Sequence, residues 1–268
     1  MGTNARPPVT LLQVRGLTKT FGLLSALREV SFDVAEREIV GLIGPNGAGK
    51  TTLVNVLGGS APGWSGDVRF DGRSLRGLPP SRIAGRGIAR TFQVAQPFAG
   101  MTVAENVMVG ILFGREGTRL RPRAARRAAA DLLMSVRLDH KAELPAESLN
   151  APERKRLEVA KALSIEPRLL LLDEVMAGLN PTEVEEAVGL ITDVRESGVT
   201  ILLIEHVMQA VASLCDRVVV LHHGEKLADG PPQAVFADPT VIDAYLGATN
   251  RQSRRERSHR PRSSSARG

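Results

Sequence analysis

The sequence predicts an α/β protein with a mixed sheet at its core, and three observations lead to this class. An apolar strand pattern at 39–43 is followed by a glycine-rich segment and then by a helix pattern from Thr52. The fully apolar run 169–172 is typical of a parallel strand that is covered on both faces. From about 102 to 167, strand patterns stop and apolar residues recur at helical spacing, which indicates a helical insert.

Length and composition limit the classes of protein that fit. The 268 residues are 43% hydrophobic, enough for one large domain or two small ones. No apolar run approaches the roughly eighteen residues that a membrane helix needs, and no signal-peptide pattern is visible, so we expect a protein on the cytosolic side. Cys215 is the one cysteine, which excludes an intrachain disulfide or a cysteine metal cluster and predicts a small buried residue.

The net charge of +6 is concentrated at the C-terminal end. Residues 251–268 hold seven arginines and one glutamate, which leaves 28 positive and 28 negative side chains in the rest of the chain. The folded part therefore gives no electrostatic case for binding nucleic acid. The segment 248–268 is predicted to be a disordered basic tail. Such a tail can touch anionic lipid or nucleic acid, but a solvated extension without a partner is the simpler interpretation.

The N-terminal part of the chain reads as strands. Residues 1–9 are expected to form a loose lead-in, and apolar and polar residues alternate at 11–15 and 30–34, as in half-buried strands. Phe21 lies between these two patterns. An aromatic side chain here can stack on adenine, because every purine offers a π-face, although spacing alone favours a core phenylalanine.

The glycine-rich segment matches the phosphate-loop pattern, which has two glycines, then Lys, then Ser or Thr. Its glycines let successive amide N–H groups point at a phosphate, and the following helix N-terminus adds partial positive charge. We expect Lys50 to reach the β- and γ-phosphates and the Thr51 hydroxyl to hold Mg²⁺. The predicted nucleotide contacts in this segment are Gly44, Pro45, Asn46, Gly47, Ala48, Gly49, Lys50, Thr51 and Thr52.

Two further strands end in groups that suit phosphate chemistry. The strand 169–172 is followed by Asp173, suited to Mg²⁺, and Glu174, suited to polarising an attacking water. The strand 200–204 ends in Glu205 and His206, at the same edge of the sheet, which favours a catalytic role for this histidine. Strands at 67–72 and 88–93, a hairpin across 222–224 and a closing helix at 235–246 complete the expected elements.

Taken in order, Phe21, the loop 44–51, Gln93, the pair Asp173 and Glu174, and His206 resemble the nucleotide-binding subunit of ABC transporters over about 10–247. The resemblance implies a P-loop NTPase of the ABC cassette fold, with a mixed core sheet, an N-terminal antiparallel β-subdomain and a helical subdomain at about 102–167. The stretches 87–93, 101–107, 177–181 and 244–247 are similar to those of branched-chain amino acid importer ATPases, and the lipopolysaccharide-export ATPase is a similar class.

The resemblance also implies roles for these residues. Phe21 would stack on the adenine of ATP, and Gln93 would touch Mg²⁺ and couple the site to membrane subunits. Asp173 would be the metal-binding Walker B aspartate, Glu174 the catalytic glutamate, and His206 the residue at the γ-phosphate. ATP and Mg²⁺ are the cofactors that this set implies.

One segment departs from the family pattern. The family's signature, Leu-Ser-Gly-Gly-Gln, acts on the γ-phosphate held by a second subunit, and its place here reads Asn150, Ala151, Pro152 and Glu153 after a leucine. Asn150 can cap the following helix and Glu153 can complete a capping box, so the helix is expected to form. Because the signature serine and glycines are gone, we expect a heterodimer with a second ABC ATPase that has a standard signature.

The functional expectation is therefore an ATPase subunit of an importer for branched-chain amino acids or related amides. It would lie peripherally on the cytoplasmic face of the membrane, contact transmembrane permease subunits through 93–109, and serve a periplasmic or extracellular substrate-binding protein indirectly. Alternatives are an ATPase of lipopolysaccharide export or another transporter, a soluble ABC ATPase, or a regulatory subunit with little turnover. Soluble ABC ATPases usually carry two cassettes or a long coiled coil, and this sequence has neither.

Overall fold

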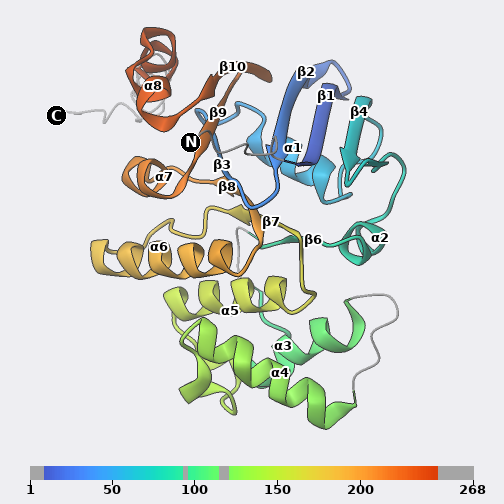
Figure 1. Cartoon of the computed structure of the whole chain (residues 1–268), viewed down its shortest axis with the longest axis vertical. Helices are drawn as coiled ribbons and strands as arrows, with labels where there is room; N and C mark the ends of the chain where they lie inside the picture. The colour runs from blue at the N-terminus through green and yellow to red at the C-terminus, as the bar shows by residue number, and fades with distance from the viewer. Residues whose placement is uncertain (1–8, 93–95, 115–120, 247–268) are drawn as a thin grey trace, which may run out of the picture.

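The computed structural model describes residues 9–92, 96–114 and 121–246, and it contains two sheets (Figure 1). The first sheet is antiparallel, with strand order β2-β1-β4-β5. Its strands are β1 (Thr10–Phe21), β2 (Leu24–Ala35), β4 (Ser65–Phe70) and β5 (Arg73–Ser74). The segment around Phe21 was expected to separate two strands. Instead β1 continues to Phe21 and turns directly into β2, because Phe21 and Leu24 pair across a tight turn.

The second sheet has six strands in the order β10-β9-β3-β8-β7-β6. Five of them run parallel, and β10 pairs antiparallel with β9, which confirms the predicted mixed core sheet and antiparallel N-terminal sheet. The strands are β3 (Ile39–Ile43), β6 (Ile88–Arg90), β7 (Leu169–Asp173), β8 (Thr200–Ile204), β9 (Arg217–His222) and β10 (Glu225–Gly230).

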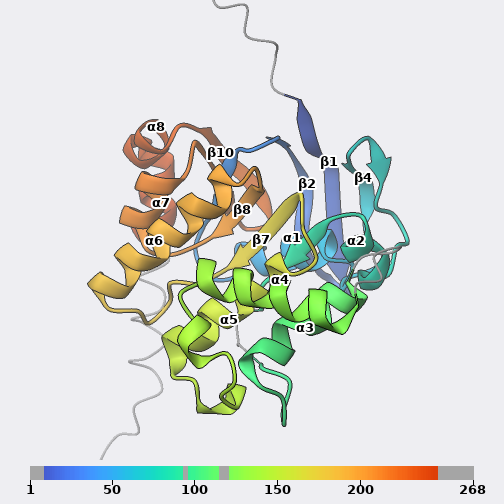
Figure 2. The same cartoon turned by 60° about the horizontal axis from the view of Figure 1, so that its bottom comes forward.

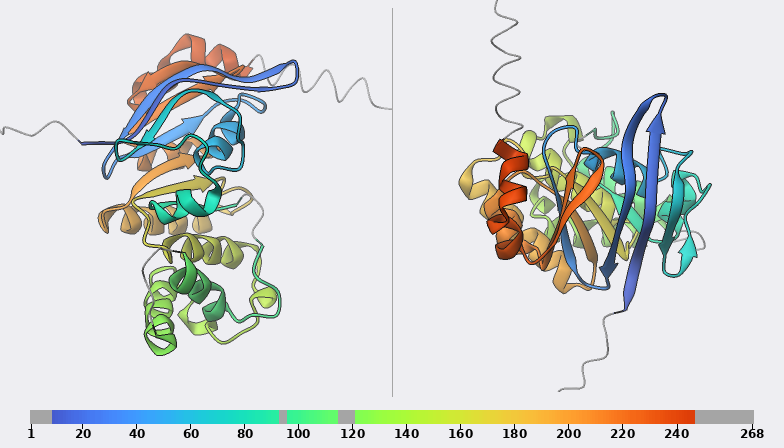
Figure 3. Two further views of the ribbon diagram at one scale, coloured as in Figure 1. Left: turned by 90° about the vertical axis from the view of Figure 1, so that its right-hand side faces the viewer. Right: turned by 90° about the horizontal axis from the view of Figure 1, so that it is seen from above.

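Helices cover both faces of this sheet. Helix α1 lies between the two sheets, α6 to α8 cover the other face, and α3 to α5 form a separate group at one end (Figure 2). Figure 3 shows this group beneath the sheets in its left view. The helices are α1 (Lys50–Leu57), α2 (Pro80–Gly85), α3 (Val103–Phe113), α4 (Pro122–Ser135), α5 (Ala151–Leu163), α6 (Pro181–Glu196), α7 (Met208–Leu214) and α8 (Pro232–Ala237), with short 3₁₀ turns at Asp139–Lys141 and Ala146–Ser148.

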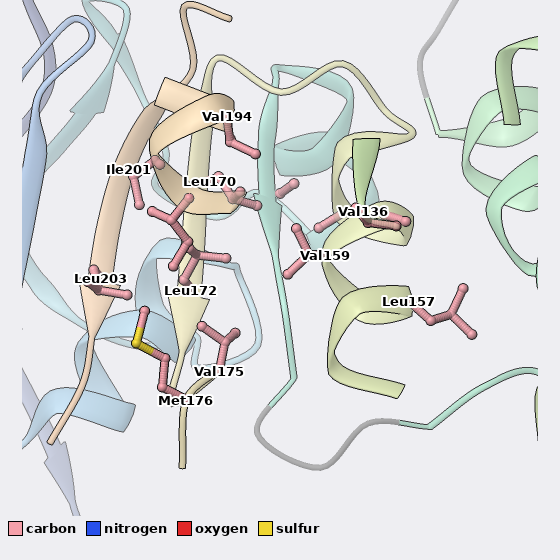
Figure 4. Packing of buried hydrophobic residues seen from close by; sticks show 14 of the residues in the cluster. Val136, Leu157, Val159, Leu170, Leu172, Val175, Met176, Val194, Ile201 and Leu203 are labelled. Atoms are coloured by element: carbon pink, nitrogen blue, oxygen red, sulfur yellow. The ribbon is translucent and has the colours of Figure 1, made fainter. Parts of the chain in front are cut away.

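Alternating residues of the buried strands supply two separate cores. Leu169 and Leu171 of β7 pack in the core that includes α1 and the antiparallel sheet. Leu170 and Leu172 face the opposite way, toward the helices, as Figure 4 shows together with Val159 of α5. Every residue of β7 is buried, which explains why its first four residues are all leucine rather than alternating apolar and polar.

Two expected elements differ from the structure. The strand expected at 88–93 ends at Arg90, because the Thr91 hydroxyl accepts the Asp173 N–H at 3.0 Å in place of a backbone carbonyl. The closing helix expected at 235–246 is broken at Asp238. Pro239 cannot donate an N–H to a continuing helix, and Asp238 Oδ1 instead accepts the Thr240 N–H at 2.8 Å to start a second helical segment at 239–246.

None of the helices within the described parts of the chain is both long enough and apolar enough to cross a membrane.

Candidate nucleotide-binding and hydrolysis site

The glycine-rich loop connects the end of β3 to α1, as the sequence predicts. Gly49 caps this helix with φ at 107°, a conformation that L-residues rarely adopt. A Cβ atom built on Gly49 would lie 2.7 Å from the Ala26 carbonyl oxygen, on the β1–β2 hairpin. Glycine is therefore required here both by the backbone conformation and by the close approach of a neighbouring strand.

The Lys50 side chain extends back from the start of α1 into the phosphate loop. This side chain is 6% exposed, and Nζ donates to the carbonyl oxygens of Gly44 at 2.6 Å and Pro45 at 3.1 Å. Burial lowers the pKa of Lys50, while the charges of Glu174 and Asp173 oppose that shift. The next residue, Thr51, is exposed at the N-terminus of α1, where N–H groups and the helix dipole favour an anion. This arrangement suits a polyphosphate.

Phe21 ends β1 and offers an aromatic surface on the same hairpin that contacts the loop. Its side chain is 52% exposed, so it is not the core residue that spacing alone would favour. The Lys19 ammonium lies 4.6 Å from the ring centroid and donates to the Pro62 carbonyl at 2.5 Å. This cation–π contact steadies a ring that remains largely open to solvent, as stacking on a base requires.

The ends of β7 and β8 bring Glu174 and His206 together. Asp173 pairs with Ile204 in the parallel register, and the Glu174 N–H donates to the Ile204 carbonyl at 2.9 Å. Glu174 has φ at 52°, and its Oε1 lies 2.8 Å from His206 Nε2. A carboxylate held against an imidazole can accept a proton from water, which is the chemistry that the sequence predicted for Glu174.

Glu205 organises this edge of the sheet and was not singled out from the sequence. It is 1% exposed, and its carboxylate accepts the backbone N–H groups of Met176 at 2.7 Å and His206 at 3.2 Å. Burial raises the pKa of Glu205, and these two hydrogen bonds oppose the shift. The carboxylate therefore joins the segment after Glu174 to the backbone of His206. The sequence feature that could have identified Glu205 is its place directly after a buried apolar strand, where a charged residue is unusual.

The donor set fits Mg²⁺ bound together with a nucleotide. Mg²⁺ prefers hard oxygen ligands and usually takes one or two from the protein, the rest coming from phosphates and water. The Thr51 hydroxyl and the Asp173 carboxylate are ligands of this kind. Within the described parts of the chain, no cluster of three or more His, Cys, Asp or Glu side chains could hold a metal alone.

The altered signature segment starts α5 in the expected way. Asn150 Oδ1 accepts the Glu153 N–H at 3.0 Å, and Glu153 Oε2 accepts the Asn150 N–H at 3.1 Å, which is a complete capping box. Lys141 Nζ donates to Glu153 Oε1 at 2.5 Å. Farther along α5, the Lys155 ammonium donates to the Ala177 carbonyl, so this helix contacts the segment after Glu174. The capping prediction is confirmed.

A family model described as ABC transporter matches residues 27–177. The chain belongs to the ABC transporter family. This match covers the phosphate loop, Asp173 and Glu174. A second model, described as branched-chain amino acid ATP-binding cassette transporter, matches residues 225–249. That segment begins at β10 and includes the helical segment at 239–246.

Individual members of the ABC transporter family are similar to this protein over most of the chain. BraF of Pseudomonas aeruginosa, a high-affinity branched-chain amino acid transport ATP-binding protein, is 42% identical over 88% of this chain and 98% of its own. LivG of Escherichia coli, with the same description, is 41% identical over the same shares. The ADP conformation of the ATP-binding cassette MJ1267 superposes with a TM-score of 0.80, 30% identity, and coverage of 89% and 99%.

The structure brings most of the predicted site residues of this ABC protein to one edge of the core sheet. The loop follows β3, Asp173 ends β7 with Glu174 directly after it, and His206 follows β8; these three strands are adjacent and parallel. Asn150 caps α5 and Glu153 lies in its first turn, outside this edge. Gln93 lies outside the residues that the structure describes.

Proposed function

We propose that this protein is the ATP-hydrolysing subunit of an importer for branched-chain amino acids or related amides. The observation that carries the enzymatic part is the Glu174–His206 pair at the same sheet edge as the phosphate loop. The substrate class is supported by the similarity to BraF and by the C-terminal match at 225–249. An ATPase of lipopolysaccharide export is the second candidate, supported by a relative with lower identity, 35%.

The site residues divide the reaction between them. Amide N–H groups of the loop, the N-terminus of α1 and Lys50 hold the phosphates, while Phe21 stacks on the adenine. Thr51 and Asp173 would hold Mg²⁺, which would supply positive charge to offset that of the phosphates. Glu174 takes the proton from a water molecule as its oxygen attacks the γ-phosphorus and the bond to the ADP oxygen breaks. His206 fixes the Glu174 carboxylate and faces the departing phosphate.

Two substitutions test this assignment. Lys50→Ala should abolish ATP binding, because the ammonium is the loop's one charged side chain. Glu174→Gln should keep ATP affinity and slow hydrolysis by about 10²–10⁴, as expected for loss of a general base. Binding is measured by titration with a fluorescent ATP analogue and hydrolysis by phosphate release. Wild-type turnover in Glu174→Gln, or unchanged affinity in Lys50→Ala, would refute the assignment.

A second ABC ATPase subunit is the proposed dimer partner. The Glu153 carboxylate lies at the N-terminus of α5 and is already held by Lys141 and the Asn150 N–H. Pro152 has no N–H to offer. A phosphate approaching this helix end from a partner's site would meet a carboxylate and fewer donors than a glycine-rich signature provides. In such a dimer, each ATP site would be a composite site, formed by the phosphate loop of one subunit and the signature segment of the other. The composite site that contains residues 150–153 of this chain should therefore bind ATP and turn over slowly.

The asymmetry between the two composite sites is directly measurable. In the assembled transporter, Glu174→Gln in this chain and the matching change in the partner should reduce ATPase activity by unequal amounts, with the larger loss from Glu174→Gln. Replacing residues 150–153 by Ser-Gly-Gly-Gln should raise the activity that remains in the Glu174→Gln complex. Equal losses, or a fully active homodimer of this chain alone, would contradict the proposal.

A cytoplasmic segment of the permease is the proposed occupant of a groove beside the site. The groove measures about 730 Å³ and lies between α2, β6 and α5, and we call it the docking groove. Phe92 and Phe98 line it and are 63% and 44% exposed, and nearby Met101 is 38% exposed. Aromatic side chains of this kind are enriched where protein surfaces meet. Cysteines at Phe98 or Met101 should crosslink to the permease, and absence of crosslinking in an intact complex would oppose this docking.

A further inference from the structure

The side chain of Arg90 connects parts of the molecule that are far apart in the sequence. Its Nη2 donates to Asp173 Oδ2 at 2.8 Å, and its Nη1 donates to Asn55 Oδ1 on α1 at 2.5 Å. The same residue lines the docking groove. One guanidinium group therefore lies between the proposed metal ligand, the helix that follows the phosphate loop, and the surface proposed to receive the permease.

The surroundings of Asp173 explain why this contact matters. Its side chain is 3% exposed and that of Arg90 is 14% exposed, so the ion pair is shielded from water. A buried carboxylate is costly without a cation and hydrogen bonds. Thr91, the next residue after Arg90, accepts the Asp173 N–H at 3.0 Å. Two successive residues at the end of β6 thus fix both the carboxylate and the backbone of Asp173.

We propose that Arg90 is a positioning residue for Mg²⁺ binding and that it couples the docking groove to the metal site. The inference rests on the proposed function, because the orientation of Asp173 matters to Mg²⁺ only if Mg²⁺ and ATP bind here. Mg²⁺ demands near-octahedral geometry, so the carboxylate oxygen that faces it must be held in a fixed direction. The hydrogen bond from Arg90 to Asp173 Oδ2 provides that direction.

Arginine suits this role better than lysine would. The planar guanidinium uses separate N–H groups for Asp173 and Asn55, so the two contacts fix the plane of the group as well as its position. The chain passes directly from Arg90 through Thr91 to Phe92, whose ring centroid lies 5.6 Å from Arg90 Cζ. A permease segment that displaces Phe92 therefore shifts Arg90, and with it the carboxylate of Asp173.

The test separates the Mg²⁺-dependent part of nucleotide affinity from the rest. The full chain is titrated with a fluorescent ATP analogue in EDTA and in excess Mg²⁺. The dissociation constant in EDTA is divided by that in Mg²⁺, and this ratio is compared between variants. Arg90→Met should leave the affinity in EDTA unchanged and reduce the ratio by about 10- to 100-fold, the usual effect of losing a partner of a metal ligand. Arg90→Lys and Asn55→Leu should give smaller reductions, because each retains the contact with Asp173.

Arg86→Met is the matched control. The Arg86 guanidinium donates to the Ser74 carbonyl at 2.8 Å, on β5, and does not line the docking groove. This variant should keep the wild-type ratio. In the assembled transporter, permease binding should change the ratio of the wild-type protein and leave that of Arg90→Met unchanged.

Two results would overturn the inference. The ratio in Arg90→Met could equal that of the wild type, which includes an equal fall in affinity with and without Mg²⁺, or the ratio could rise. If Arg90→Met does not fold, Arg90→Lys and Asn55→Leu decide, and unchanged ratios in both would overturn it. Wild-type protein that binds ATP without any Mg²⁺ dependence would remove the proposed function as well, which distinguishes the two failures.

Discussion

A pair of glycine substitutions in the phosphate loop separates backbone strain from steric contact. Gly47 has φ at 80°, and a Cβ built on it has no heavy atom within 4 Å. Gly49 has φ at 107°, and its Cβ would lie 2.7 Å from the Ala26 oxygen and 2.9 Å from a methyl carbon of Leu27. Gly47→Ala should cost about 1–2 kcal/mol of unfolding free energy for the left-handed conformation alone.

Gly49→Ala should cost more because the hairpin must also move. Overpacking typically adds about 1–3 kcal/mol, which brings the total to about 2–5 kcal/mol. At about 2–4 °C per kcal/mol for a chain of this size, the melting temperature of Gly49→Ala should lie about 2–12 °C below that of Gly47→Ala. Differential scanning calorimetry of both variants without nucleotide measures this difference. Equal melting temperatures would refute the close approach of Ala26 to the loop.

Two other predictions concern Glu205 and Phe21. Because burial raises the folded-state pKa of Glu205, its contribution to stability is present below the ordinary pKa of 4.5 and is lost as pH rises through the folded pKa. Between these two pKa values, the free energy of unfolding of Glu205→Gln minus that of the wild type should therefore rise by about 1.4 kcal/mol per pH unit. Urea unfolding at several pH values measures this difference, and a difference that does not change with pH would contradict the prediction. Phe21→Ala should lose about 1–3 kcal/mol of ATP affinity through lost stacking, whereas Phe113→Ala, which removes an exposed ring of α3, should lose none.

Elements that depend on neighbours in the sequence were predictable. The strand, glycine loop and helix at 39–57 follow from local apolar periodicity and from the conformations that glycine allows. The capping box of α5 likewise depends on two residues three positions apart. The uninterrupted helix predicted at 235–246 was wrong, because the apolar pattern on both sides of Asp238 outweighed the proline after it, which cannot continue a helix.

Contacts across the core sheet could not be predicted, because they depend on the order of its strands. Arg90 and Asp173 are 83 positions apart, and they meet only because β6 pairs with β7 at the edge of the sheet. Glu205 reaches the Met176 N–H because β8 lies beside β7. Nothing in the sequence around Arg90 distinguishes it from the many arginines that are solvated. Its role follows from long-range pairing alone.

The three carboxylates at this edge of the sheet each follow or end an apolar strand in the sequence, but their environments favour a different role for each. Asp173 is 3% exposed and is neutralised by Arg90, which suits a fixed metal ligand. Glu205 is 1% exposed and accepts hydrogen bonds from backbone N–H groups, which suits a structural residue that connects two segments of the backbone. Glu174 has a side chain that is 19% exposed and a titratable partner in His206 at 2.8 Å. A proton acceptor needs access to water and a neighbour that tolerates a change of charge, and of these three residues Glu174 alone meets both conditions.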